Sequence, residues 1–282
     1  MVENAASAPP PAPPASGSAL GARIASALVM IPVALAAVWY GAPWSSGLAA
    51  LAAALMAWEW GRMVGRSPGL VDGLLLAGIA ALSVLIGAYT AVWLGLLAGL
   101  LGILLQHRLA GARNAAPVWT ALGLAWIIAP CIGFVWLRDD PVEGAATVFW
   151  LLAVVWAIDT AAYAAGKSIG GPKLAPRISP KKTWAGLIGG VLAAIIVGLV
   201  TGLIVGSGKV WTIGLLSGAL AIVEQIGDMA ESFAKRRFGA KDSGNLIPGH
   251  GGLLDRLDGM LAVVLAVVIL SLVTGGSVLS WR

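Results

Sequence analysis

Residues 146–168, with the sequence ATVFWLLAVVWAIDTAAYAAGKS, contain an apolar run that is long enough to cross a bilayer. A membrane-spanning helix needs about 17–25 mostly apolar residues, and similar runs recur from residue 20 to the end of the chain. Charged residues make up only 11% of the sequence and the mean hydropathy is +0.91. A soluble domain typically has about 25% charged residues. The sequence therefore predicts an all-α, polytopic membrane protein.

The loop charges indicate how many spans there are and how they are oriented. The third and fourth apolar runs are separated only by residues 87–90, and fusing them would leave eight spans. With nine spans, the loops rich in Lys and Arg fall on one side, as the positive-inside rule requires for the cytoplasm. We therefore expect a multi-pass protein of the cell (plasma or inner) membrane with a cytoplasmic N-terminus. The spans are expected near residues 20–40, 44–64, 69–89, 91–107, 117–137, 145–165, 184–206, 210–228 and 256–275.

The composition divides the chain into three parts. Residues 1–18 are rich in Pro, Ala and Ser, which is typical of a disordered tail. Residues 19–144 hold about five spans with few charges, and residues 145–282 form the C-terminal region. Eighteen of the 31 charged side chains lie within residues 159–258, so the chemistry is expected there. The N-terminal spans could provide a lipid access route or a homodimer contact, and no nucleic-acid partner is expected.

Two polar features follow the opening stretch. Asp159 lies inside the apolar run, where a carboxylate is a functional candidate by default, although it could instead pair with a neighbouring helix for structure. The next loop, GKSIGGPKLAPRISPKKTW, has five cations and no acid, which suits binding of phosphate. The same cations could instead only set the topology or contact anionic lipid. Ser179 or Thr183 could cap the helix that follows.

A polar stripe begins inside the apolar run at 210–228. Glu224, Asp228, Glu231 or Ser232, and Lys235 recur every three or four residues, so they share one helix face. Such a stripe fits a carboxylate that holds a cation, followed by cations that hold phosphates. Glu231 and Lys235 could also be only an i,i+4 ion pair.

The segment PGHGGLLDRLDG, residues 248–259, opens the last span. Asp255 and Asp258 lie three residues apart at its start, and capping alone could explain one of them. Together with Asp228 they form a set of hard oxygen donors, which suits Mg²⁺. His250 has only His107 as a second histidine, so a phosphate contact or a loop hydrogen bond is favoured over a metal site.

Carboxylates for Mg²⁺ and lysines for phosphate oxygens are what phosphoryl or nucleotidyl transfer requires. The chain has neither a Walker GxxxxGK[ST] motif nor a Rossmann GxGxxG motif. A cation transporter or channel is the alternative from another class, with Asp159, Asp228 and Asp258 lining a pathway.

The C-terminal region carries a set of polar motifs in a fixed order: Ser232, Lys235-Arg236, Lys241-Asp242, Pro248-Gly249-His250-Gly251-Gly252 and Asp255-Arg256-Leu257-Asp258. Upstream of them lie Asp159, ISPKKTW at residues 178–184 and the pair Gly227-Asp228. Together these motifs resemble the phosphatidate cytidylyltransferase family (CDP-diacylglycerol synthases), and the resemblance covers about residues 150–275. Two departures from the family pattern are Ala185, where a Glu is usual, and Ala234.

This resemblance implies conversion of CTP and phosphatidate to CDP-diacylglycerol and pyrophosphate, in phospholipid biosynthesis, with Mg²⁺ at the membrane surface. It implies Asp228 and Asp255 as metal ligands with Asp258 in support, and leaves open whether a second cation binds. A CTP-dependent lipid kinase, such as a polyprenol kinase, is a nearer alternative. The residues expected to act on the substrates are Ser232, Lys235, Arg236 and Lys241, with Asp159, Lys167, Lys173, Ser179, Lys181, Lys182 and His250.

Overall fold

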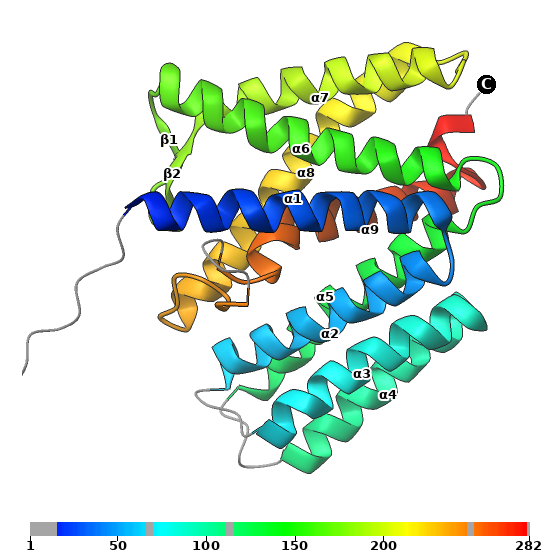
Figure 1. Cartoon of the computed structure of the whole chain (residues 1–282), viewed down its shortest axis with the longest axis vertical. Helices are drawn as coiled ribbons and strands as arrows, with labels where there is room; N and C mark the ends of the chain where they lie inside the picture. Colours follow the sequence, from blue (N-terminus) through cyan, green and yellow to red (C-terminus); the bar gives the residue numbers. More distant parts are fainter. Residues whose placement is uncertain (1–15, 66–69, 111–115, 247–250, 281–282) are drawn as a thin grey trace, which may run out of the picture.

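The computed structural model describes residues 16–65, 70–110, 116–246 and 251–280. Within these residues the chain forms nine α-helices and one two-stranded hairpin (Figure 1). A short 3₁₀ turn, Val278–Ser280, follows the last helix. The elements are α1 Ser16–Tyr40, α2 Trp44–Val64, α3 Leu70–Tyr89, α4 Val92–Ala110, α5 Pro117–Arg138, α6 Gly144–Ser168, β1 Lys173–Ala175, β2 Ser179–Thr183, α7 Trp184–Ile204, α8 Val210–Arg237 and α9 Leu254–Thr274.

The all-α membrane architecture is confirmed. Each of the nine expected spans coincides with a helix, and α3 and α4 are separate. Among the described residues, the seven helices α3 to α9 are long and apolar enough to cross a membrane. Helix α8 extends past the predicted end of its span because the polar stripe remains helical as far as Arg237. Helix α1 begins at Ser16, inside the range predicted as tail, and residues 1–15 lie outside the described residues.

The helices pack around two buried apolar clusters that share α9. One cluster joins α2, α3 and α5, and α9 contributes Leu254 and Leu261 to it. The other joins α5, α6 and α8, and α9 contributes Val263 and Val267 to it. Figure 1 shows the same division, with α2 to α5 in one group, α6 to α8 in the other, and α9 between the two. The last helix therefore connects the two halves of the molecule.

Helix α7 packs closely between α6 and α8. Its buried positions recur every fourth residue and are all small: Gly186, Gly190, Ala194, Gly198 and Gly202. Small residues allow the backbones of neighbouring membrane helices to approach closely. The position of α7 sets the position of the hairpin, because β2 continues directly into α7.

The hairpin itself was not predicted from the sequence. Strand β1 pairs antiparallel with β2, and Ala175 lies opposite Ser179. Thr183 caps α7, since its Oγ1 accepts a hydrogen bond from the Gly186 amide at 3.1 Å. Of the two expected caps, Thr183 is therefore confirmed, whereas Ser179 begins the second strand.

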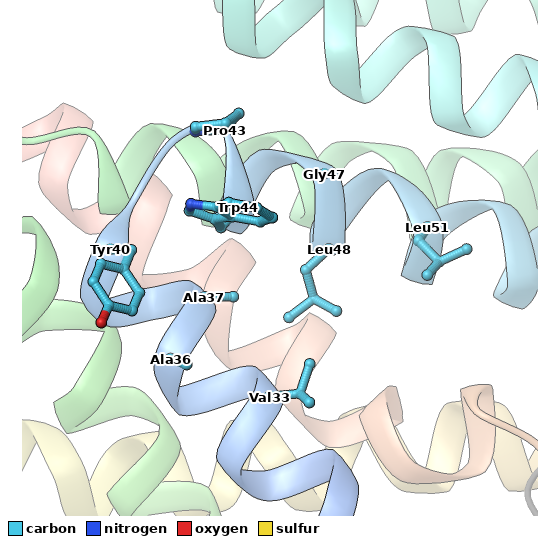
Figure 2. Close-up of a pocket in the computed structure, with 9 residues that line it drawn as sticks. All are labelled: Val33, Ala36, Ala37, Tyr40, Pro43, Trp44, Gly47, Leu48 and Leu51. Atoms are coloured by element: carbon cyan, nitrogen blue, oxygen red, sulfur yellow. The ribbon is translucent and has the colours of Figure 1, made fainter.

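An apolar groove of about 850 Å³ lies between α1 and α2. Figure 2 shows Val33, Leu48 and Leu51 bordering it, with Tyr40 and Trp44 near the connection between the two helices. In Figure 1 this connection lies at the opposite end of the bundle from the hairpin. None of the predicted site residues lines this groove.

Candidate active site

The predicted site residues gather at one end of the helical bundle. The hairpin, the C-terminal end of α8 and the start of α9 all lie at this end, on the left in Figure 1. The start of α9, at Leu254, lies 71 residues beyond the end of β2, at Thr183. The fold thus brings the lysine-rich loop and the aspartates together, as the sequence predicted.

An ion pair connects the hairpin to α8. Lys182 at the end of β2 pairs with the Asp228 carboxylate. The hydroxyl of Ser232, one turn further along α8, donates to Oδ1 of Asp228 at 3.2 Å. Neither Lys182 nor Asp228 is fully buried, so a ligand can reach both side chains.

A cavity of about 300 Å³ opens between α6, β2, α7 and α8. It is lined by both acids and lysines, and Asp159 and Glu224 lie close enough to Asp228 and Asp258 for their charges to interact. A pocket with both signs of charge can hold a phosphate group and a cation together. The charged residues that line it are Asp159, Lys167, Lys181, Lys182, Glu224 and Asp228.

Gln225 is a cavity residue that the sequence reasoning missed. The residue is 8% exposed and lines the cavity. Within the described part of the chain its Nε2 has no hydrogen-bond partner. A buried amide without a partner is costly, so a ligand acceptor in the cavity would satisfy it. The available signal was a second polar residue beside Glu224 in an otherwise apolar stretch.

A second ion-pair network joins the C-terminal end of α8 to the start of α9. Lys235 donates to Oε2 of Glu231 at 3.1 Å and to Oδ1 of Asp255 at 2.7 Å. The i,i+4 pair that the spacing allows as an alternative is present, and the contact with Asp255 adds a connection to α9. The Glu231 side chain is 1% exposed, and its carboxyl group lies beside that of Asp258. Lys235 therefore neutralises a dense group of buried acids.

Asp255 organises the backbone around it. Its two oxygens accept the Ser243 amide at 3.1 and 2.9 Å, and Oδ2 also accepts the Gly252 amide at 2.9 Å. With Lys235 these contacts use the roughly four acceptor sites of a carboxylate. Binding of a metal by Asp255 would require one of these contacts to open, and the flexible Lys235 side chain is the most easily displaced.

The carboxylates of the site are of the kind that could bind Mg²⁺. In the described ranges, no three His, Cys, Asp or Glu side chains are arranged as a metal site. Mg²⁺ usually takes only one or two carboxylates and completes its shell with water and substrate phosphate. Asp228 and Asp258, with Asp159 and Glu224 nearby, supply carboxylate oxygens of the type it prefers. The residues present therefore fit this ion, with the phosphates as further ligands.

The remaining predicted residues are placed as follows. Lys167 lies over the ring of Tyr163, 5.6 Å from its centroid. Arg236 donates to the carbonyl oxygen of Ala240 at 3.4 Å. Lys173 on β1 and Lys241 after α8 are exposed, and His250 lies outside the described residues.

The N-terminal helices contribute a second residue that the sequence reasoning missed. Glu59 on α2 is buried and accepts hydrogen bonds from the amides of Leu253 and Leu254 at the start of α9. It also borders a second cavity, of about 320 Å³, between the end of α2 and residues 240–246. The available signal was a single carboxylate inside an apolar stretch, WEW at residues 58–60.

Comparison with known proteins agrees with these features over most of the chain. The model of the cytidylyltransferase family matches residues 21–274. A Brucella suis protein named phosphatidate cytidylyltransferase is 37% identical over 256 residues, which cover 87% of this chain and 90% of the relative. A Pseudomonas aeruginosa protein of the same name is 36% identical and covers 86% of this chain and 93% of the relative. One from Haemophilus influenzae is 29% identical, with 86% and 95% covered.

Proposed function

Because the chain belongs to the cytidylyltransferase family, we propose that it is a phosphatidate cytidylyltransferase, which makes CDP-diacylglycerol and pyrophosphate from CTP and phosphatidate. The observation that carries this proposal is the family match over residues 21–274, supported by relatives of that name whose lengths are about nine-tenths covered. The match includes the N-terminal helices as well as the polar segments, so the similarity extends from α1 to α9.

The proposed reaction needs no general base. An oxygen of the phosphatidate phosphate attacks the α-phosphorus of CTP, the new P–O bond forms, and the bond to the bridging oxygen of pyrophosphate breaks. A phosphate monoester has a second pKa near 6, so it is mostly a dianion at neutral pH. Catalysis then consists of holding the two phosphates in line and neutralising their charge. A site rich in Lys and Asp suits this chemistry.

The lysines and acids of the site divide this work. Lys181 and Lys182 at the cavity would contact phosphate oxygens, and Lys235 would add positive charge from the side of α9. Asp228 pairs with Lys182. When the substrate phosphates bind Lys182, this ion pair would open and Asp228 would bind a cation. The mixed charge of the cavity supports this division, because Lys182 and Asp228 form an ion pair in which a phosphate and a cation can replace the two partners.

We include Mg²⁺ in the proposal, with Asp228 as the first ligand and Asp255 and Asp258 as the further carboxylates. When bound, the ion would supply positive charge to the phosphates and to the leaving pyrophosphate. We also propose that the site faces the cytoplasm and serves phospholipid synthesis, since CTP arrives from water and phosphatidate from the leaflet.

The proposal predicts that the purified protein in detergent releases pyrophosphate only when CTP, phosphatidate and Mg²⁺ are all present. Radiolabelled CTP should transfer its CMP group to the lipid product. Replacing phosphatidate with a polyprenol should abolish product, because the nucleophile would then be an alcohol. No pyrophosphate in the complete mixture, together with ion flux in proteoliposomes, would overturn the enzyme proposal in favour of a transporter or channel.

Lys181→Ala is expected to raise the KM for CTP or for phosphatidate by about tenfold, the value of one charge-assisted hydrogen bond. Lys181 is exposed and lines the cavity, and no ion-pair partner is found for it within the described residues. Arg177→Ala on the turn of the same hairpin is the matched control, because Arg177 does not line the cavity. Steady-state kinetics that leave both KM values unchanged would assign the lysines of this loop to membrane topology.

A further inference from the structure

A buried carboxylate in the N-terminal half of the chain contacts the segment that carries Asp255. Glu59 lies on α2 and is only 2% exposed. A carboxylate taken out of water is costly unless hydrogen bonds or an opposite charge compensate it. Its partners therefore indicate what the fold uses it for.

Two hydrogen-bond partners of Glu59 lie at the start of α9. Its Oε1 accepts the Leu253 amide at 2.9 Å, and its Oε2 accepts the Leu254 amide at 2.9 Å. The first N–H groups of a helix have no partner inside the helix, and the N-cap residue Leu253 offers no side-chain cap. Glu59 thus caps α9 from a different helix.

Two glycines leave room for this carboxylate. A Cβ added to Gly252 would lie 2.7 Å from Oε2 of Glu59, and one added to Gly244 would lie 2.7 Å from Oε1. Real Cβ atoms do not approach other atoms so closely. Both glycines precede Asp255 in the sequence, and a larger residue at either position would collide with Glu59.

Ser243 connects Glu59 to the candidate active site. Its hydroxyl donates to Oε2 of Glu59 at 3.3 Å, while its amide donates to both oxygens of Asp255 at 3.1 and 2.9 Å. Asp255 in turn accepts from Lys235 at 2.7 Å. A chain of direct contacts therefore runs from α2 to the lysine at the end of α8.

We propose that Glu59 is a positioning residue for the cytidylyl transfer, which holds Ser243 and the start of α9 so that Asp255 and Lys235 keep their working geometry. This inference rests on the proposed function. It gives the N-terminal helices a role in the chemistry through their contact with Ser243 and the start of α9. Glu59 acts through the backbone, and its contribution belongs to kcat and not to substrate affinity.

Glu59→Gln tests the inference because it keeps the shape and replaces one acceptor oxygen with an NH₂ group that faces an amide N–H. We expect kcat to fall by about 10–100-fold, the usual effect of losing a residue that orients an active-site group. The KM for CTP and for phosphatidate should change by less than about threefold. Hydrogen exchange at the Leu253 and Leu254 amides should become faster. Glu59→Asp, which keeps the charge, should recover part of the kcat.

Trp60→Phe is the matched control. Trp60 is the next residue of α2, and its Nε1 donates to the Trp119 carbonyl oxygen at 2.9 Å, away from Asp255. This variant should disturb the packing of α2 yet leave kcat and the two exchange rates at wild-type values. A wild-type kcat in Glu59→Gln would overturn the inference. If Glu59→Gln does not fold, a wild-type kcat in Glu59→Asp with faster exchange at Leu253 and Leu254 would overturn it equally.

The two proposals fail in different ways. If the wild-type protein transfers no CMP from CTP, the proposed function fails, and hydrogen exchange still reports whether Glu59 caps α9. If the wild type is active and the Glu59 variants have normal kcat, only the positioning role fails.

Discussion

Asp228→Asn is expected to lower kcat for CMP transfer by about 1,000-fold, as loss of a main electrostatic contact in an active site does. The neutral amide can still accept the Ser232 hydroxyl, but it no longer pairs with Lys182 or attracts a cation. The change is isosteric, so the protein should insert and fold as the wild type does. Turnover measured with radiolabelled CTP, alongside size-exclusion profiles in detergent, tests both parts of the prediction.

Asp72→Asn provides the control, because Asp72 lies in the first turn of α3, in the other group of helices. A rate in Asp228→Asn close to the wild-type rate would remove this residue from the site.

Lys235→Met is expected to abolish turnover and to destabilise the protein by about 3 kcal/mol, as removal of one partner from a buried ion pair does. The side chains of Lys235, Glu231 and Asp255 are 11%, 1% and 9% exposed, so water cannot replace the lost charge. The thermal midpoint in detergent can be followed by tryptophan fluorescence, since the chain has 13 Trp.

Arg237→Met is the control for this variant, because Arg237 is an exposed cation two residues further along α8. Adding Glu231→Gln to Lys235→Met removes one of the uncompensated charges, so stability should recover in part while activity stays absent. An unchanged midpoint in Lys235→Met would show that the network contributes no stability, and normal turnover would remove Lys235 from the site.

Patterns within one segment of the sequence predicted the helices and the stripe of polar residues on α8. The nine expected spans coincide with helices, and, within the described residues, the seven helices α3 to α9 are long and apolar enough to cross a membrane. Apolar length favours a helix there because every backbone group needs a partner inside its own segment. The stripe from Glu224 to Lys235 follows from the spacing of a helix face, and α8 confirms it. Thr183 was one of two candidates for the cap of α7, with Ser179 as the other. The sequence alone did not decide at which residue the helix begins.

Contacts between distant segments could not be predicted in the same way. Lys235 was expected to pair with Glu231 four residues away, and its shorter contact is with Asp255, 20 residues away across a loop. Glu59 was overlooked because a single acid in an apolar stretch has no periodicity, and its partners are about 190 residues further along. The hairpin joins the end of α6 to the start of α7, so its shape depends on how these two helix ends are placed by helix packing.

The cap that Glu59 provides also has a consequence for the order in which the protein is made. Chains are synthesised from the N-terminus, so Glu59 is made 194 and 195 residues before Leu253 and Leu254. Until then, the Glu59 carboxylate lacks these two partners. A chain that stops before α9 keeps this uncompensated acid and never gains Asp255. The arrival of the last helix therefore completes both the hydrogen bonding of Glu59 and the candidate active site.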